Sequence, residues 1–374
     1  MPAQEVEVNG VSRSVAIVGG GVIGTSIAWQ AARRGWRVRL YDPQFAASPT
    51  SIASASWVAG GMLAPLSEGW PGEDDVLALG SASLDLWPEF GGALEAATGL
   101  ELFTSSSSLT VALDTADAQD LETIAEWVTA QGRELRILSR SEVRDCEPSL
   151  GRGVRMGLLS EAERAVDNRL LLSALRSSAA SEGVECVGES VSDVDALEAD
   201  QVVIAAGTGS ATLWPGLPVR PVKGEILRLR TRPGVTPPPT RTIRASVHGR
   251  ACYLVPRADG IVVGATQYES ADTQVTVAGV RNLIADAETL IPALGEYELH
   301  ETSAGLRPMS PDNLPLIGRL SDRVIAATGH GRNGILLTPV TAAAVVALLD
   351  GSELGEAAAA DPSRFRLKER ELSR

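Results

Sequence analysis

Three polar side chains in the second half of the chain have the chemistry needed to hold a small carboxylate. Arg307 lies in Gly305-Leu-Arg-Pro308, where a guanidinium could bind a carboxylate through two parallel hydrogen bonds and the proline would stiffen the adjoining backbone. Tyr253 is one of only four tyrosines, and its hydroxyl could donate to a substrate. Arg332 lies inside a glycine-rich loop. Taken singly, these residues favour structural roles over binding: a salt bridge for Arg307, a core position for Tyr253 and an exposed loop position for Arg332.

A glycine pattern near the amino terminus predicts a dinucleotide site. Gly19, Gly21 and Gly24 form the GxGxxG motif directly after a β-branched run, and Asp42 follows 18 residues after Gly24. The first glycine permits a tight turn, the second lets the backbone approach a pyrophosphate, and the third lets a helix pack on a strand. The helix N-terminus attracts phosphate, and the Asp42 carboxylate could accept a ribose hydroxyl.

A second glycine-rich loop, Gly329-His-Gly-Arg-Asn-Gly334, follows a short apolar run near the carboxyl end. It could direct another helix N-terminus towards a ligand, and a reduced flavin would gain from such a positive end. An ordinary connection between a strand and a helix explains the loop equally well. The choice between FAD and NAD therefore stays open at this point.

The elements that must position these residues follow from hydrophobic spacing and turn signals. A parallel β-α-β unit is expected at the start, an antiparallel sheet in the middle with a hairpin turn at Asp259-Gly260, and a second parallel unit near the end. Asp167 and Asn168 are expected to cap a helix. The expected strands cover residues 15–18, 37–41, 200–206, 226–230, 242–247, 252–256, 261–266 and 324–327, and the expected helices cover residues 23–34, 116–131, 170–180 and 335–349.

Composition excludes several classes of function. The net charge of -14, from 33 Lys and Arg against 47 Asp and Glu, disfavours binding to nucleic acid. Three scattered cysteines and three scattered histidines form no metal motif, and an odd cysteine count fits a reducing compartment. The first 14 residues lack an apolar core and no apolar run is long enough to span a bilayer, so we expect a soluble cytoplasmic protein that does not bind membranes.

Seven short motifs together resemble one enzyme family. The ordered set is similar to the D-amino-acid oxidase superfamily and, within it, to the glycine oxidases of thiamine biosynthesis, over residues 14 to 350. The motifs are Gly19–Gly24, Ala59-Gly-Gly-Met-Leu-Ala64, Tyr253-Leu-Val-Pro-Arg257, Val262-Val-Gly-Ala-Thr266, Ala304-Gly-Leu-Arg-Pro308, Asp312-Asn-Leu-Pro-Leu-Ile-Gly318 and Gly329-His-Gly-Arg-Asn-Gly-Ile-Leu-Leu337.

The resemblance implies an α/β (α+β) fold in which a discontinuous Rossmann-like FAD domain is joined to a substrate domain with an antiparallel sheet. The implied FAD domain comprises residues 14–105, 160–220 and 304–350, the substrate domain residues 106–159 and 221–303, and the tails residues 1–13 and 351–374. Arg307 and Tyr253 would hold the substrate carboxylate, with Arg332 where substrate meets flavin. The implied cofactor-binding residues are Gly19, Gly21, Val22, Ile23, Gly24, Asp42, Pro43, Ala55, Ser56, Gly60, Gly61, Met62, Val191, His330, Gly331, Arg332, Asn333, Gly334, Ile335 and Leu336.

The same resemblance implies a reaction. The expected activity is oxidation of glycine by FAD and dioxygen, giving an imine or glyoxylate and hydrogen peroxide. The expected assembly is a homo-oligomer such as a tetramer, and the expected partner that receives the imine is thiazole synthase. No cysteine lies near residues 307–313, so a non-covalent FAD is expected. Gln267 stands where some glycine oxidases carry an apolar residue. Oxidation of sarcosine or D-amino acids, a flavin dehydrogenase with another acceptor, and a nucleotide-binding sensor are the alternatives.

Overall fold

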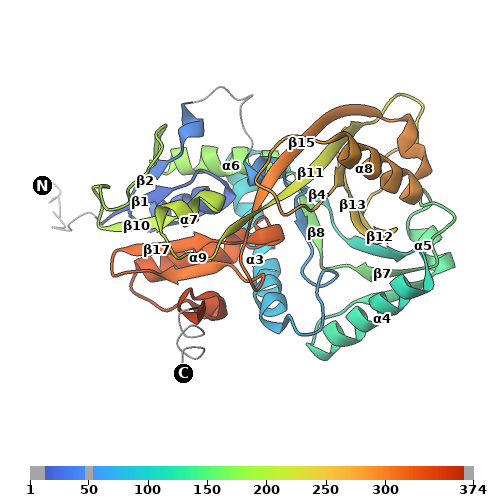
Figure 1. Ribbon diagram of the computed structural model, residues 1–374, viewed down its shortest axis with the longest axis horizontal. Helices are drawn as coiled ribbons and strands as arrows, with labels where there is room; N and C mark the ends of the chain where they lie inside the picture. Colours follow the sequence, from blue (N-terminus) through green and yellow to red (C-terminus); the bar gives the residue numbers. More distant parts are fainter. Residues whose placement is uncertain (1–12, 47–53, 366–374) are drawn as a thin grey trace, which may run out of the picture.

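The protein has two halves, each built around one large β-sheet. The computed structural model describes residues 13–46 and 54–365. Strands β1, β2, β10 and β17 lie in one half and β5, β7, β12 and β13 in the other, with the long strands β11 and β15 reaching from one half towards the other (Figure 1).

The first half contains a six-stranded sheet with the order β16-β17-β10-β1-β2-β9. Only β16 runs antiparallel to its neighbour. The central strands are short β-branched runs that are buried along their whole length, as expected for a parallel sheet covered on both faces. The strands are β1 (Ser14–Val18), β2 (Arg37–Tyr41), β9 (Glu185–Val187), β10 (Gln201–Ile204), β16 (Leu316–Arg319) and β17 (Val324–Thr328).

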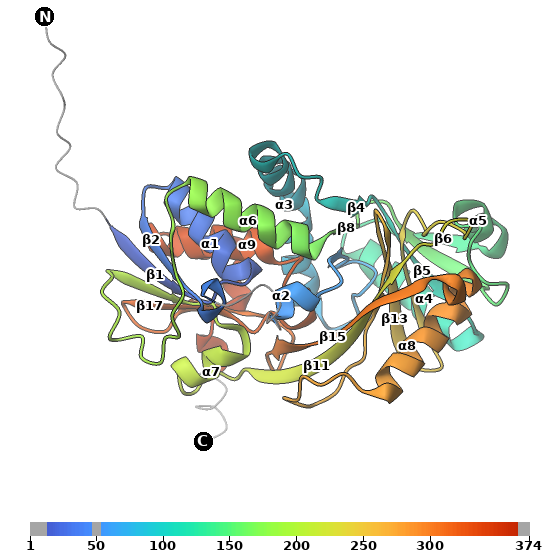
Figure 2. The ribbon, with the colours of Figure 1, turned by 90° about the horizontal axis from the view of Figure 1, so that it is seen from above.

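Helices α1, α6 and α9 pack along one face of this sheet (Figure 2), and α3 lies against α6 and α9. Asp167 caps α6 by accepting hydrogen bonds from the amides of Arg169 and Leu170, which confirms the predicted cap. Almost every residue of α9 is buried, because this helix is apolar on all sides. The helices are α1 (Val22–Arg33), α3 (Asp74–Thr98), α6 (Asn168–Ser181), α7 (Ser210–Leu213) and α9 (Thr338–Leu349).

The second half contains an eight-stranded sheet with the order β15-β11-β14-β13-β12-β5-β7-β6. All its pairs are antiparallel except β12 with β5. The strands are β5 (Ser108–Ala112), β6 (Arg136–Ser139), β7 (Met156–Ser160), β11 (Arg220–Arg230), β12 (Thr242–Val247), β13 (Arg250–Arg257), β14 (Gly260–Gly264) and β15 (Glu298–Met309).

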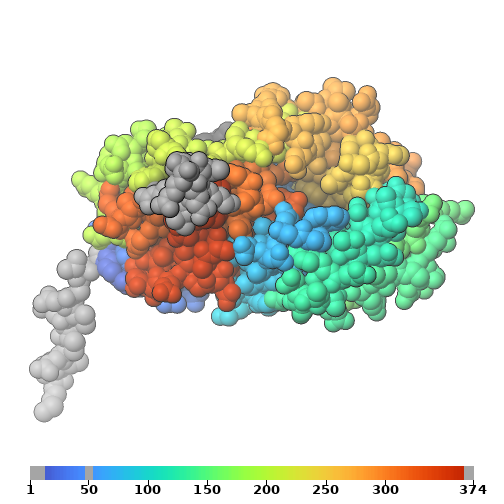
Figure 3. All heavy atoms as spheres, turned by 60° about the horizontal axis from the view of Figure 1, so that its bottom comes forward, coloured from blue at the N-terminus to red at the C-terminus, as the bar shows by residue number. Residues whose placement is uncertain are grey.

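Short elements complete the two halves. A three-stranded antiparallel sheet, β3-β8-β4, lies between the large sheets. On the face shown in Figure 3, light-blue residues that include part of α3 lie beside the red carboxyl-terminal segment. The remaining elements are β3 (Met62–Leu63), β4 (Phe103–Ser105), β8 (Arg164–Val166), α2 (Ala55–Val58), α4 (Thr115–Ala130), α5 (Arg140–Cys146), α8 (Val277–Leu290), and the 3-10 turns Pro43–Phe45, Gly207–Gly209, Pro292–Glu296, Gly331–Asn333 and Gly355–Ala360.

The structure confirms the predicted fold class, and it corrects details. The hairpin between β13 and β14 turns at Ala258 and Asp259, while Gly260 is already in the strand and pairs with Arg257. A side chain at Gly260 would meet the Leu229 carbonyl at 1.9 Å, so the strand position itself requires glycine. Helix α9 begins at Thr338 and not at residue 335. Within the described part of the chain, no helix combines the length and the apolarity needed to cross a membrane.

Candidate functional site

The first glycine-rich turn forms an open helix end. Gly19 has φ +114°, and a side chain at Gly24 would meet the Gly19 carbonyl at 1.8 Å. Gly21 precedes α1 and supplies no capping side chain, while Val22 and Ile23 are buried in the first turn. Because amides at a helix N-terminus have no partner within the helix, this end presents donors and a positive dipole. A helix end of this kind attracts phosphate groups.

Asp42 lies beside this turn, at the end of β2. One carboxylate oxygen accepts a hydrogen bond from the Gly20 amide at 2.6 Å, and the other accepts one from the Gln44 amide at 2.8 Å. Pro43 begins the 3-10 turn that follows. Val191 packs in the same apolar cluster as Tyr41. Strand β2 therefore places a carboxylate and an apolar patch next to the glycine turn.

Residues 55–62 pass close to the same helix end. The Ser56 hydroxyl accepts a hydrogen bond from the Val22 amide at 3.1 Å, so α2, which begins at Ala55, is tied to the start of α1. Gly61 has φ +86°, and a side chain there would meet the Val166 carbonyl at 2.0 Å. Met62 packs against the same small cluster as Tyr253. The segment therefore links the glycine turn to the second half of the molecule.

The second glycine-rich loop connects β17 to α9 through His330, Gly331, Arg332, Asn333 and Gly334. The His330 ring is buried and its Nε2 lies 3.0 Å from the Thr341 hydroxyl. Burial lowers the pKa of His330 from 6.5 to about 3, so the ring is neutral near pH 7.

The end of this loop is held by α3. Ile335 and Leu336 are buried, and the Leu336 carbonyl accepts hydrogen bonds from the Ser83 hydroxyl at 2.6 Å and the Trp87 indole at 2.8 Å. Both donors bind the carbonyl of Leu336, which was expected to lie in the first turn of the helix. The later start of α9 has this physical cause.

Tyr253 lies on β13 with its ring between two glycines. A side chain at Gly60 would come within 2.7 Å of the ring, and one at Gly264 within 2.1 Å. The ring is half-buried, and no described residue shares a hydrogen bond with its hydroxyl. Burial raises the pKa of the phenol, and the charge of Arg307 opposes the rise only in part. Tyr253 therefore presents a protonated, unused donor near Arg307.

Arg307 lies on β15, and its guanidinium rests over Gly224 of the neighbouring strand. A side chain at Gly224 would approach the guanidinium to 2.4 Å. Nη1 donates to the carbonyls of Lys223 at 3.4 Å and Thr266 at 3.2 Å. Among the described residues no carboxylate pairs with Arg307, so the alternative of a salt bridge does not hold there. A half-buried guanidinium without an anion is suited to an anionic ligand.

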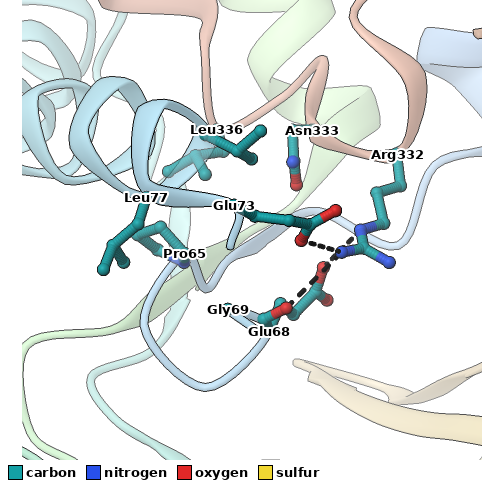
Figure 4. Close-up of a pocket in the computed structure, with 9 residues that line it drawn as sticks. Pro65, Glu68, Gly69, Glu73, Leu77, Arg332, Asn333 and Leu336 are labelled. Atoms are coloured by element: carbon teal, nitrogen blue, oxygen red, sulfur yellow. Dashed lines mark hydrogen bonds and ion pairs between the residues drawn. The ribbon is translucent and has the colours of Figure 1, made fainter. Parts of the chain in front are cut away.

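Arg332 has carboxylate partners, unlike Arg307. Its Nε lies 3.3 Å from the Glu68 carboxylate and one Nη lies 3.8 Å from Glu73, as Figure 4 shows. Arg244 approaches the other Glu68 oxygen at 3.2 Å. Sequence reasoning missed Glu68 and Arg244, because neither stands in a recognisable motif and their contacts join segments far apart in the chain. The four residues Arg332, Glu68, Glu73 and Arg244 form one charge network beside the second glycine loop.

The carboxyl end of β15 joins these features. Met309 forms an isolated bridge with His330, two residues beyond Arg307. The charge of Glu68 also raises the pKa of Tyr253, so the tyrosine lies within electrostatic reach of both Arg307 and Glu68. The structure thus brings the predicted residues Tyr253, Arg307 and Arg332 to one region, where the second glycine loop meets the eight-stranded sheet.

The family described as FAD dependent oxidoreductase (DAO) matches residues 14–348. The chain belongs to this family. The match covers most of the chain, including both glycine-rich loops and the strands that carry Tyr253 and Arg307.

Two relatives and one solved structure are similar to this chain over most of its length. A protein of Synechocystis sp. named bifunctional protein ThiO/ThiG is 34% identical over 90% of this chain, and this chain spans about half of it, 51%. A glycine oxidase of Geobacillus kaustophilus is 30% identical, with 91% of this chain and 93% of the relative covered. The crystal structure of glycine oxidase from Geobacillus kaustophilus matches with a TM-score of 0.83, covering 91% of this chain and 96% of that one.

The described residues fit the FAD that the family name requires. The N-cap residue of α1, Gly21, has no side chain of its own to fill the helix end, and Asp42 lies next to it. Glycines at 19, 24 and 61 keep the backbone close together where side chains would clash. No cluster of three or more His, Cys, Asp or Glu side chains within residues 13–46 and 54–365 could hold a metal ion.

Proposed function

We propose that this protein oxidises glycine with FAD and dioxygen. The observation that carries the proposal is the Arg307 guanidinium, which has no carboxylate partner among the described residues and lies within electrostatic reach of a free phenol. The names of the glycine oxidase relatives support the choice of substrate. A small amino acid supplies one carboxylate for this guanidinium, and its side chain needs little room.

Each residue has a role in the proposal. Arg307 binds the carboxylate of the substrate through two N–H donors, and the Tyr253 hydroxyl donates to the same group. Gly224, Gly60 and Gly264 leave the room that these two side chains need. Arg332, which Glu68 and Glu73 balance in charge, borders the site on the side of the second glycine loop. Catalysis then consists mainly of orientation, because the cofactor supplies the redox chemistry.

The cofactor would be held by the residues that the family resemblance implies: the first glycine turn with Val22 and Ile23, Asp42 with Pro43, Ala55, Ser56, Gly60, Gly61, Met62, Val191 and residues 330–336. When bound, FAD accepts two electrons from the substrate carbon. Glycine loses two electrons and two protons to become an imine, which reacts with water to give glyoxylate and ammonia. Dioxygen takes up the two electrons and two protons and becomes hydrogen peroxide. No side-chain base is needed if the amine binds in its neutral form.

We also propose a biosynthetic role, in which thiazole synthase uses the imine for the thiazole of thiamine. The ThiO/ThiG relatives support it, because their names describe two functions in one chain and this chain covers about half of each. Hydrolysis would compete with transfer of the imine. A homo-oligomer such as a tetramer and a cytoplasmic location belong to the same proposal, as do the discontinuous FAD and substrate domains with the predicted boundaries.

The cofactor is proposed to be non-covalent. Of the three cysteines, Cys252 is buried among the apolar residues on the face of β13 opposite Tyr253. Cys146 is the last residue of α5 in the second half, and Cys186 lies on β9 at the edge of the six-stranded sheet. None of them stands on the segment 307–313. Trichloroacetic acid should therefore release all the yellow chromophore into the supernatant.

Absorption spectra of the purified protein test the proposal. The protein should show a flavin band that bleaches when glycine is added without oxygen and returns with air, and peroxide should form in step with glycine consumed. A panel of glycine, sarcosine, D-alanine and D-proline separates glycine oxidation from the other amine oxidases. Bleaching followed by very slow return in air would favour a dehydrogenase. A flavin that no amine bleaches would contradict the proposed function.

A further inference from the structure

Glu163 is a completely buried carboxylate that holds a segment with no regular secondary structure. It stands between β7 and β8 and has an exposed fraction of 0%. One of its oxygens accepts hydrogen bonds from the Leu66 and Ser67 amides, each at 2.7 Å. The other accepts one from the Ser67 hydroxyl at 2.7 Å and a short one from the Ser108 hydroxyl. Four donors thus converge on one side chain.

This arrangement replaces a strand or helix for the segment that links β3 to α3. Residues 64–67 are buried although they form no regular element, so the amides of Leu66 and Ser67 need an acceptor. The Glu163 carboxylate accepts from the amides of two successive residues and fixes the direction in which the chain leaves them. Burial raises the pKa of Glu163, while the hydrogen bonds from Ser108 and Ser67 and the charge of Arg244 oppose the rise.

The next residue after this anchored pair is Glu68. A chain of contacts runs from the buried carboxylate to the border of the site: the Ser67 hydroxyl accepts from Arg244 at 3.1 Å, and Arg244 pairs with Glu68 at 3.2 Å. Glu68 then pairs with Arg332 at 3.3 Å, and its backbone carbonyl accepts from Arg332 at 3.4 Å. Figure 4 shows the end of this chain, where Glu68 points towards Arg332.

We propose that Glu163 is a positioning residue for substrate binding, which acts by fixing Ser67 and Glu68 so that Glu68 holds Arg332 at the edge of the site. This proposal rests on the function proposed above, because its kinetic test measures glycine oxidation. Its binding test, with acetate, does not depend on turnover. Glu163 itself is enclosed away from the ligand. Its influence must therefore pass through Glu68. The effects of substitutions at Glu163 and Glu68 on substrate binding should then depend on each other, which can be tested.

Glu163→Ala should raise the glycine KM by about 10- to 100-fold and change kcat less, since a misplaced positioning group weakens binding geometry. The Kd of acetate, read from the shift it causes in the flavin absorption band, should rise by a similar factor. Glu163→Gln should give KM and Kd values between those of wild type and Glu163→Ala, because its remaining oxygen still accepts from both amides. If Glu163→Ala does not fold, Ser67→Ala tests the same series of contacts.

A matched control separates positioning from stability. Glu147 is another buried carboxylate, 5% exposed, which accepts hydrogen bonds from the Thr240 amide and the Ser149 hydroxyl in the distant part of the second half. Glu147→Ala should lower the Tm as Glu163→Ala does, with an unchanged KM and acetate Kd. An equal rise of KM in Glu147→Ala would refute the positioning role.

The decisive measurement is a double-mutant cycle with Glu68→Gln. If Glu163 acts through Glu68, removing Glu163 should have little further effect on KM and on the acetate Kd once Glu68 is already changed. Effects that simply multiply would overturn the proposal. A wild-type protein that binds acetate but does not oxidise glycine would contradict the proposed function, and the acetate cycle would still decide the role of Glu163.

Discussion

Removing the guanidinium of Arg307 should abolish most glycine oxidation while leaving the fold intact. The side chain gives only two long hydrogen bonds to carbonyls, at 3.2 and 3.4 Å, so Arg307→Ala should lower the free energy of unfolding by about 1 kcal/mol or less. The expected loss in binding is larger, because two charge-assisted hydrogen bonds to the substrate carboxylate disappear together.

The magnitude follows from these bonds. Losing one partner of a desolvated charge pair costs about 2–5 kcal/mol, and about 3 kcal/mol corresponds to a roughly 150-fold lower kcat/KM. Arg307→Lys keeps the charge but cannot form two parallel bonds, so about half of that free energy and a loss of about 10-fold are expected.

Oxygen consumption with glycine, measured with the flavin content normalised, checks both variants. Arg220→Ala is the control, because Arg220 begins β11 in the same pair of strands and makes an exposed ion pair with Glu269. It should leave kcat/KM unchanged. If Arg307→Ala keeps kcat/KM within about threefold of wild type, the assignment of Arg307 as the carboxylate anchor is wrong.

Three further changes test neighbouring features of the site. Tyr253→Phe should leave the Tm unchanged, because no described residue bonds to the hydroxyl, and should lower kcat/KM for glycine by about 10-fold; an unchanged kcat/KM would exclude the hydroxyl as a substrate donor. Gly224→Ala should raise the glycine KM, because the new methyl would lie 2.4 Å from the guanidinium and displace Arg307, and a wild-type KM would show that the guanidinium does not need this space. The pKa of His330 is lowered to about 3 in the folded protein, so its contribution to stability is complete above pH 6.5 and falls as the pH drops towards 3. Urea unfolding should show that lowering the pH from 6.5 to 5 costs wild type about 2 kcal/mol more than His330→Gln, and equal losses would contradict the buried neutral ring.

Local signals in the sequence were sufficient for the first β-α-β unit. The run 15–18, the three glycines and the helix after them lie within 20 residues, and each is specified by its own neighbours. The cap at Asp167 was predictable for the same reason, because a capping side chain and its amides are separated by two or three residues. Ordered motifs then indicated the family, which the match over residues 14–348 confirms.

The strand that carries Arg307 was not predictable in this way. Strand β15 is largely polar and half-exposed, and its pairing partner β11 includes Pro221 and Gly224, which are poor strand formers. Helix α3 was missed because Pro88 and three glycines interrupt its helical signal. Both elements are stabilised by contacts with distant segments, so their local propensities mislead.

The Glu163 and Glu68 network shows the physical limit of reading a sequence alone. Residues 161–164, Glu-Ala-Glu-Arg, resemble an exposed charged turn, yet one of the two glutamates is completely buried. Its burial is tolerated only because amides and hydroxyls from segments some 55 to 97 residues away converge on it. Composition cannot reveal such convergence, because it is a property of the packed chain. The same packing that hides Glu163 places Glu68 next to Arg332, and for this reason a change in the interior is expected to be felt as a change in substrate affinity.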